Sequence, residues 1–318
     1  MNHPASYLRV GALALLWGAS FLLIKLALTA LSPVQVAFTR IALGAAVLVV
    51  LCAVRGIRLR GDRRLWTHVA VAGFFASALP WVLFSMAERT VDSGLAGVLN
   101  ATTPLWTILF GFLAGTERGL SPRMLAGLAI GFGGVLLIMA PWDGAASGIG
   151  LVACLGATAS YGIAYVHIGR NLTGSRDGGP APVPLAMAGM QLVAATGIAA
   201  FALPLDGLPP VRFDLVALLA VAVLGVFGTG VGFALNYRLI ADEGPTAAAT
   251  VTYLMPIVSV LLGALVLGEQ IGSRVVLGIA LVLAGVALSR RNRTRVPRFP
   301  AASGAEVYTD LATNHPMK

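Results

Sequence analysis

Two basic side chains interrupt otherwise apolar stretches of the sequence. Lys25 lies near the end of the stretch 8–30, and Arg40 lies seven residues after Pro33 in the stretch 33–54. A charge in apolar surroundings normally faces a partner or a wet cavity, because leaving it unsolvated is costly. Both residues are therefore candidates for binding an anionic group of a small molecule. The alternatives are that Lys25 extends its ammonium to an interface and that Arg40 makes a structural hydrogen bond to a neighbouring helix end.

An uncharged polar residue and two aromatic residues complete the set of candidate binding residues. Gln191 lies seven residues after Pro184, the same spacing that separates Arg40 from its own proline. We therefore expect the same face of two equivalent helices to line a wet interior. Trp17 and Tyr161 each precede a glycine at equivalent places in the two halves of the chain, and aromatic rings can stack on a small molecule. The alternative for these two residues is packing at the lipid interface.

Residue types that carry catalysis or bind metals form no pattern in the sequence. Cys52 and Cys154 lie far apart in apolar stretches, and the four histidines show no ligand spacing, so we predict no enzyme, metal or cofactor. Phosphate-binding glycine motifs are absent, which argues against ATP as an energy source. Glu117 and Glu269 each lie at a helix end just before the next helix begins. We interpret both as favourable partners for the positive N-terminal end of that next helix.

The composition indicates which environment holds these residues. Of the 318 residues, 58% are hydrophobic and only 11% are charged, and the mean hydropathy is +0.87. A water-soluble domain has more than twice that charged fraction, so the sequence predicts an all-α integral membrane protein. Apolar runs long enough to cross a bilayer number ten, at 8–30, 33–54, 66–87, 92–115, 122–140, 148–169, 183–204, 214–238, 245–267 and 272–289. The first run is too long for a signal peptide, and we expect it to be a retained helix.

The distribution of Lys and Arg predicts the orientation. With the N-terminus inside, only Arg89, Arg212 and Arg274 fall in outer loops, and most other basic residues fall in inner loops or in the basic tail 291–318. This asymmetry is the one that sets membrane topology. We therefore predict cytoplasmic N- and C-termini and a disordered cytoplasmic tail, and we interpret the net charge of +9 as a topology signal and not as a sign of nucleic-acid binding.

The sequence contains two similar halves. Asn100-Ala-Thr-Thr-Pro-Leu105 corresponds to Thr252-Tyr-Leu-Met-Pro-Ile257, and in both copies a glutamate, Glu117 or Glu269, follows thirteen residues after the proline. Five helices in each half is an odd number, so the second half enters the membrane from the opposite side. Inverted repeats of this kind are typical of secondary transporters, whose substrate site lies between the repeats near the midplane.

Several segments make the chain similar to a known family. They are LLWGASFLLIKLAL (15–28), SPVQVAFTRIALGA (32–45), the stretch from Ala96 through PLWTILFGFLAGTE to Glu117, and PIVSVLLGALVLGEQ (256–270) with GIALVLAGVAL (278–288). The chain resembles the EamA-type members of the drug/metabolite transporter superfamily. The resemblance covers residues 8–290. It implies a ten-helix carrier of the inner membrane, often an exporter of amino acids or related metabolites, with one five-helix repeat at 8–140 and another at 148–290.

We therefore expect a secondary transporter that works by alternating access, with a midplane cavity lined by helices 1–4 and 6–9. Lys25 and Arg40 indicate an anionic or zwitterionic small-molecule substrate. Because no Asp or Glu falls in the middle of a helix, we expect facilitated transport or coupling without a buried carboxylate. The glycine-rich helices 5 and 8 predict close packing, and helices 5 and 10 are expected to be scaffold or homodimer surfaces.

Three alternatives remain open. The first is a sugar-phosphate or nucleotide-sugar exchanger of the same superfamily, for which more intramembrane Lys and Arg are expected. The second is a membrane enzyme, which would need a cluster of His, Asp, Glu or Cys at one membrane face. The third is a scaffold or receptor that transports nothing, which the paired polar residues of helices 2 and 7 disfavour.

Overall fold

The computed structural model describes residues 4–116, 121–139, 148–172, 183–243, 245–270 and 272–289. These residues form helices and connecting loops and contain no strand, which confirms the predicted all-α class. The elements are α1 (Pro4–Ala27), α2 (Pro33–Val54), α3 (Arg63–Gly73), η1 (Phe74–Ala78), α4 (Leu79–Ala87), α5 (Ser93–Asn100), α6 (Thr103–Leu113), α7 (Pro122–Met139), α8 (Gly148–Asn171), α9 (Pro184–Ala202), η3 (Pro204–Asp206), α10 (Leu215–Val223), η4 (Leu224–Val231), α11 (Gly232–Glu243), α12 (Pro245–Leu267) and α13 (Ser273–Ser289). The tail 291–318 and Glu117 lie outside the described residues.

Each predicted apolar stretch contains one or more of the observed helices. Seven helical segments of the described chain are long and apolar enough to cross a membrane, and three shorter apolar helices, 122–138, 251–267 and 273–289, lie where the other three stretches were predicted. The number of ten crossings therefore remains a prediction. Two stretches are less uniform than the sequence suggested. The stretch 66–87 contains the π-helical η1 between α3 and α4, and the stretch 92–115 is divided into α5 and α6.

Two helices begin with a serine cap followed by a proline. The Ser32 hydroxyl accepts a hydrogen bond from the Gln35 backbone N–H, and the Gln35 side-chain oxygen accepts one from the Ser32 N–H, so α2 begins with a complete capping box. Ser121 likewise accepts a hydrogen bond from the backbone N–H of Met124 at the start of α7. Such caps satisfy backbone donors that the first helical turn leaves unpaired.

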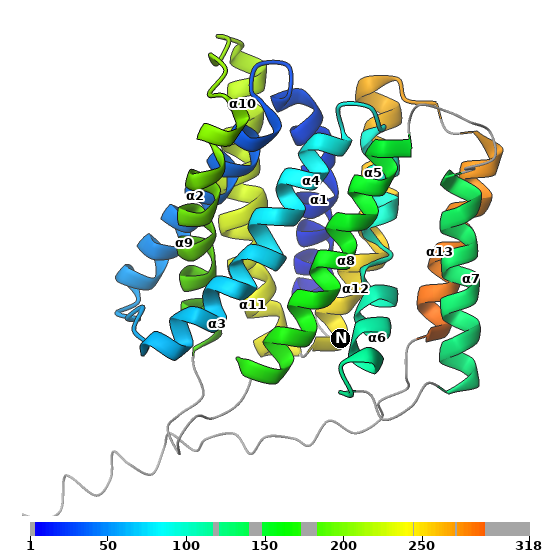
Figure 1. Ribbon diagram of the computed structural model, residues 1–318, viewed down its shortest axis with the longest axis horizontal. Helices are drawn as coiled ribbons and strands as arrows, with labels where there is room; N and C mark the ends of the chain where they lie inside the picture. The colour runs from blue at the N-terminus through cyan, green and yellow to red at the C-terminus, as the bar shows by residue number, and fades with distance from the viewer. Residues whose placement is uncertain are drawn as a thin grey trace, which may run out of the picture.

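The two halves pack as inverted repeats (Figure 1). Helix α1 packs on α12 as α8 packs on α5 and α6, and α2 packs on η4 as α9 packs on η1. The glycines confirm the residue alignment of the repeats. Gly18 leaves room for Val258, and Gly162 leaves room for Trp106; these neighbours each lie two residues after the repeated prolines, Pro256 and Pro104. Equivalent glycines therefore accept equivalent partners.

The contacts of Glu269 show that its predicted partner, the next helix in the chain, is wrong. Its carboxylate accepts hydrogen bonds from the backbone N–H groups of Ser93 at 2.7 Å and Gly94 at 2.9 Å. It therefore caps the N-terminus of α5, in the other repeat, and not the helix α13 that follows it in the chain. The expected type of interaction, a carboxylate at a helix N-terminus, is present, but the helix was misidentified because a single sequence does not show which helix ends meet in space.

Glycine contacts hold α7 against α13 at one edge of the bundle (Figure 1). A Cβ on Gly134 would lie 2.8 Å from the carbonyl oxygen of Gly278 and 2.8 Å from the backbone nitrogen of Val282. The predicted close packing is therefore confirmed for this helix. The glycine faces of both helices are used within the chain, so a homodimer would need other faces.

Replacing Gly134 by alanine is expected to destabilise the protein by about 2 kcal/mol, because backbone atoms of α13 would have to move away from the new methyl group. The adjacent Gly133 is a matched control, since a Cβ there meets nothing within 4 Å. Gly133→Ala should be neutral or stabilising, because alanine favours the helix. Thermal unfolding in detergent measures both, and equal melting temperatures for the two variants would contradict the close contact.

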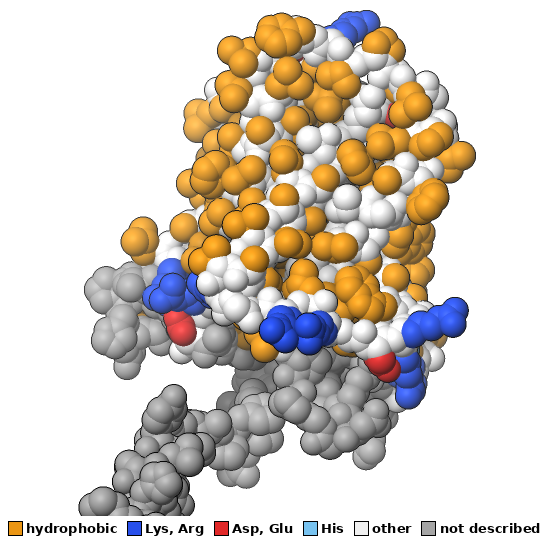
Figure 2. All heavy atoms as spheres, turned by 90° about the vertical axis from the view of Figure 1, so that its left-hand side faces the viewer, with side chains coloured by type: hydrophobic (Ala, Val, Ile, Leu, Met, Phe, Trp, Pro, Cys, Tyr) orange, Lys and Arg blue, Asp and Glu red, His pale blue; other side chains and the backbone are white. Residues whose placement is uncertain are grey.

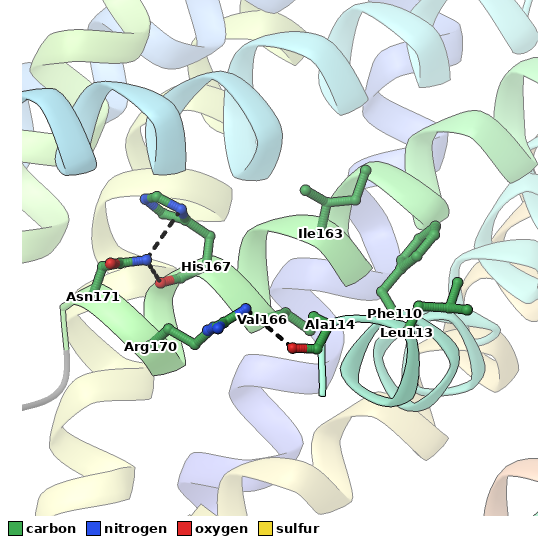
Figure 3. Close-up of a pocket in the computed structure, with 8 residues that line it drawn as sticks. All are labelled: Phe110, Leu113, Ala114, Ile163, Val166, His167, Arg170 and Asn171. Carbon is green, nitrogen blue, oxygen red and sulfur yellow. Dashed lines mark hydrogen bonds between the residues drawn. The ribbon is translucent and has the colours of Figure 1, made fainter. Parts of the chain in front are cut away.

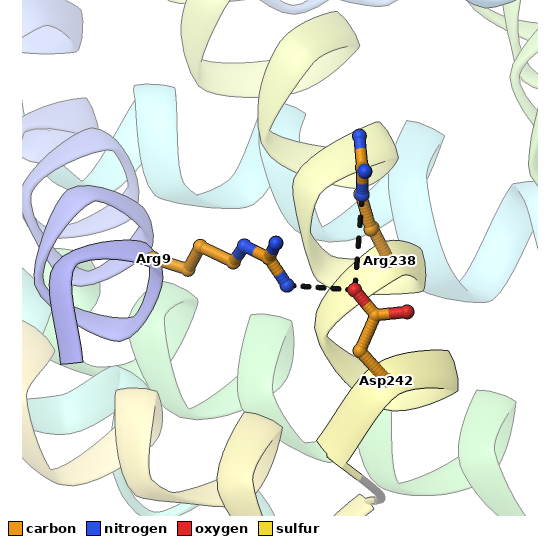
Figure 4. Close-up of polar contacts among 3 residues, drawn as sticks. All are labelled: Arg9, Arg238 and Asp242. Atoms are coloured by element: carbon orange, nitrogen blue, oxygen red, sulfur yellow. Dashed lines mark hydrogen bonds and ion pairs between the residues drawn. The ribbon is translucent and has the colours of Figure 1, made fainter. Parts of the chain in front are cut away.

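The surface carries the pattern of a membrane protein. Figure 2 shows apolar side chains over the middle of the molecule, with most of the visible Lys and Arg gathered toward the lower end of the view. Near this end, Arg9 Nη1 of α1 lies 2.6 Å from Asp242 Oδ2 of α11, and Arg238 Nε lies 3.7 Å from the same oxygen (Figure 4). The first of these ion pairs connects the beginning of α1 with the end of α11, and the second lies within α11.

Candidate functional site

Arg40 is buried in the interior of the bundle, on α2. Its guanidinium carbon lies 4.0 Å from the centroid of the Trp81 ring, a cation–π contact, and its Nε donates a 3.0 Å hydrogen bond to Thr229 Oγ1 of η4. The residue is 8% exposed. Among the described residues, it forms no ion pair and its two terminal nitrogens have no hydrogen-bond partner. Arg40 therefore has donors left for a ligand.

Gln191 occupies the place in the second repeat that Arg40 occupies in the first. Its Nε2 donates to Ser77 Oγ of η1 at 3.2 Å, as Arg40 donates to Thr229 of η4. Ser77 and Thr229 both lie in π-helical turns and each follows a glycine, Gly73 or Gly225, by four residues. The two polar contacts are thus related by the repeat.

These glycines allow the helices to approach closely. A Cβ on Gly73 would lie 2.8 Å from the carbonyl oxygen of Gln191, and one on Gly225 would lie 2.7 Å from Leu43 Cβ. Larger residues at these two positions would push η1 away from α9 and η4 away from α2. The hydroxyls of Ser77 and Thr229 would then lie out of hydrogen-bonding reach of their partners.

Further aromatic rings connect with Trp81, the ring over which the Arg40 guanidinium lies. Trp81 Nε1 donates a 2.7 Å hydrogen bond to the Tyr161 hydroxyl, and Phe233 lies edge-on to Trp81 with ring centroids 6.4 Å apart. Trp17 lies 6.2 Å from Phe233 and donates a hydrogen bond from Nε1 to the Gly228 carbonyl. We name this group the central cluster, and we include Gln191 because its partner Ser77 lies four residues before Trp81. The central cluster consists of Trp17, Arg40, Trp81, Tyr161, Gln191 and Phe233.

The central cluster combines one buried cation, a carboxamide and four rings. Arg40 and Trp81 are buried, whereas Trp17, Tyr161, Gln191 and Phe233 keep part of their surface exposed. Helices of both repeats contribute to it. An arrangement of this kind can bind an anionic group through the guanidinium and pack the rest of a small molecule against aromatic faces.

Lys25, the remaining predicted binding residue, lies apart from the central cluster. Its Nζ donates to the backbone carbonyls of Glu88 at 2.7 Å and Val91 at 2.8 Å. Lys25 therefore neutralises the carbonyl end of α4, where a cation is electrostatically favoured. A part for Lys25 in substrate binding stays a prediction. The alternative, in which Lys25 extends its ammonium to an interface, does not describe this contact.

A hollow of about 530 Å³ lies elsewhere, between α6 and the end of α8 (Figure 3). Its polar residues are His167, Arg170 and Asn171, and its apolar residues include Phe110 and Ile163. Arg170 donates to the Ala114 carbonyl and Asn171 contacts His167, so these polar groups are partly engaged with one another and with the backbone. The hollow includes no residue of the central cluster.

Sequence reasoning did not select Trp81 and missed Ser77, Thr229 and Phe233. A signal for them existed. Gly73, Ser77 and Trp81 have the same spacing as Gly225, Thr229 and Phe233 in the other half. Extending the repeat alignment to the third helix of each half would have found them.

Comparison with known proteins agrees with this arrangement. The profile of the EamA-like transporter family matches residues 6–140 and, a second time, residues 148–291. The chain belongs to the EamA-like transporter family. The resemblance seen in the sequence is thereby confirmed, and the chain is a membrane transporter of the drug/metabolite transporter type.

Relatives of this EamA-like transporter carry transporter names. The uncharacterized inner membrane transporter YedA of Escherichia coli K12 is 27% identical over 295 residues, with 92% of both chains covered. An uncharacterized transporter of Archaeoglobus fulgidus is 27% identical over 280 residues, covering 87% of this chain and 95% of the relative. Together with the apolar helices, the relationship to YedA indicates a multi-pass inner-membrane protein.

A solved crystal structure supports the fold of this EamA-like transporter. It superposes with a TM-score of 0.61 over 90% of this chain and 96% of its own, at 21% identity. At that identity the similarity shows the fold alone. The nature of the substrate has to be inferred from the central cluster.

Proposed function

We propose that this EamA-like transporter exports a small metabolite with a carboxylate or another anionic group, such as an amino acid, by alternating access. The observation that carries the proposal is the environment of Arg40. Its terminal guanidinium nitrogens have no hydrogen-bond partner among the described residues, and its guanidinium carbon lies over the Trp81 ring. A positioned guanidinium with free donors suits a carboxylate, which accepts two parallel hydrogen bonds.

The proposed mechanism is a rocking of one repeat against the other around the central cluster. Its residues come from both repeats, and the inverted arrangement makes the inward-open and outward-open packings nearly equivalent. The Lys and Arg distribution supports cytoplasmic N- and C-termini in this proposal. The single cation of the central cluster favours a carboxylate over the phosphate groups of a sugar phosphate or nucleotide sugar.

A metabolite survey tests the proposal. Cells that overproduce the protein should release one or a few anionic or zwitterionic metabolites into the medium, and their cytoplasmic pools should fall. Cells producing the Arg40→Ala variant at the same membrane level are the control. The released compound is then labelled and tested for exchange in vesicles that contain the purified protein. Release of cationic compounds only would contradict the proposed substrate class.

A further inference from the structure

Glu88 is an acidic residue that the proposed function does not use. It follows the last residue of α4 and is 1% exposed. Both carboxyl oxygens are buried, and neither has a hydrogen-bond partner among the described residues. The sequence placed Glu88 in a loop, so its burial is a result of the structure.

The charged groups around Glu88 are already engaged or lie at a distance. Lys25 of α1 donates to the backbone carbonyl of Glu88 and not to its carboxyl group. The carboxylate of Glu269, from the loop after α12, faces the backbone of α5. Arg40 of α2 and Cys154 of α8 interact with Glu88 only through space.

Two further polar groups lie in this region. The Ser93 hydroxyl of α5 is also buried without a hydrogen-bond partner among the described residues. Asp92 precedes it and interacts electrostatically with Glu269 and Lys25. A carboxylate at Glu88 would therefore add a further negative charge to those of Asp92 and Glu269. The lysine of this region, Lys25, directs its hydrogen bonds to backbone carbonyls.

An ionised carboxyl group without hydrogen bonds in such surroundings is strongly disfavoured, whereas its neutral form fits them. We propose that Glu88 is the proton-binding group of this transporter: it is protonated while buried, as in this structure, and releases its proton to water when the end of α4 opens during the transport cycle. The O–H bond of the carboxyl group breaks and water takes the proton, so no other reactant is needed. The proposal rests on the proposed function, because a proton carried in this way would drive export.

Helix α4 connects Glu88 with the central cluster. Trp81, Phe84 and Glu88 lie three and four residues apart and therefore on one face of the helix. Phe84 contacts the Tyr161 ring at a centroid distance of 6.3 Å. A movement of α4 that exposes Glu88 to water also moves Trp81 relative to Arg40. Proton release and substrate release are thereby linked through one rigid element.

Infrared spectroscopy of the purified protein in phosphatidylethanolamine–phosphatidylglycerol vesicles tests the protonation of Glu88 without any substrate. The wild-type protein should show a protonated-carboxyl C=O band at neutral pH, and this band should be missing in Glu88→Gln. Glu269→Gln is the matched control, since Glu269 accepts hydrogen bonds as a carboxylate, and this variant should keep the band. Absence of the band from the wild-type protein, or its persistence in Glu88→Gln, would overturn the proposal.

Proton flux tests the coupling. The same vesicles are loaded with the pH-sensitive dye pyranine, and a mixture of the proteinogenic amino acids is added as the probe. The wild-type protein should move protons when the probe is added. Glu88→Gln should show the flux of protein-free vesicles but keep the exchange of labelled amino acids, and Glu88→Asp should restore part of the flux. Unchanged flux in Glu88→Gln overturns the proposal. If the wild-type protein exchanges no probe at all, the proposed substrate class is at fault, and the infrared result still decides the role of Glu88.

Discussion

Arg40→Ala abolishes transport while the protein still inserts and folds: this is the largest functional effect that we expect from a single substitution. Alanine removes the cation over Trp81 and the free donors that the proposed substrate would use. It also removes a costly buried charge, so stability should change little. Exchange of a labelled substrate in vesicles measures the loss, and size-exclusion chromatography with circular dichroism measures folding.

Two further variants separate the possible causes of the loss. Arg40→Lys keeps the charge but not the planar guanidinium and should recover only a small part of the activity. Arg123→Ala removes a positive charge from α7, where Arg123 donates to the Leu288 carbonyl at an exposed site, and should leave transport unchanged. Full transport in Arg40→Ala would exclude Arg40 from the binding site.

Glu269→Ala should produce the largest loss of stability. Its carboxylate accepts two backbone hydrogen bonds from the start of α5, across the interface between the repeats. Without it, the N–H groups of Ser93 and Gly94 lose their partners, and we expect the free energy of unfolding to fall by about 2 kcal/mol or more. Thermal unfolding in detergent should show a clearly lower melting temperature than that of the wild type.

The matched control is Asp214, which caps α10 within its own repeat. Asp214 Oδ1 accepts from the backbone N–H groups of Val216 and Ala217. Asp214→Ala removes the same kind of cap at an exposed and local site, so we expect a loss of at most about 1 kcal/mol. Equal losses in both variants would mean that the Glu269 contact stabilises only a helix end and not the junction of the repeats.

Much of the fold could be predicted because a bilayer imposes strong constraints on sequence. Each crossing needs a long apolar run, and such runs located every helix of the described chain. The repeat alignment placed Gly18 and Gly162 at equivalent positions, and in the structure each leaves room for a residue of a neighbouring helix. Helix interruptions were missed, since a π turn keeps the same apolar composition as the helix around it.

The candidate site was predicted in part. The sequence selected Arg40, Gln191, Trp17 and Tyr161 because the repeat gave each of them an equivalent partner. All four belong to the central cluster as we define it. The contact of Lys25 with the end of α4 could not be read from the sequence, since it depends on which helix end lies beside α1. The burial of Glu88 was missed for the same reason, because a residue after the last helical turn is exposed or covered according to its neighbours.

The two π-helical stretches have a consequence for how the interior is aligned. A π turn closes its hydrogen bond one residue later than an α turn, so each stretch contains a surplus of chain length. Removing one residue from η1, for example Ala76, would use up this surplus and leave an α-helix whose two flanks keep their relative rotation. The aromatic face of α4 should therefore tolerate a one-residue deletion in η1, whereas the same deletion in a regular α-helical stretch would rotate one side of the helix by about 100° relative to the other.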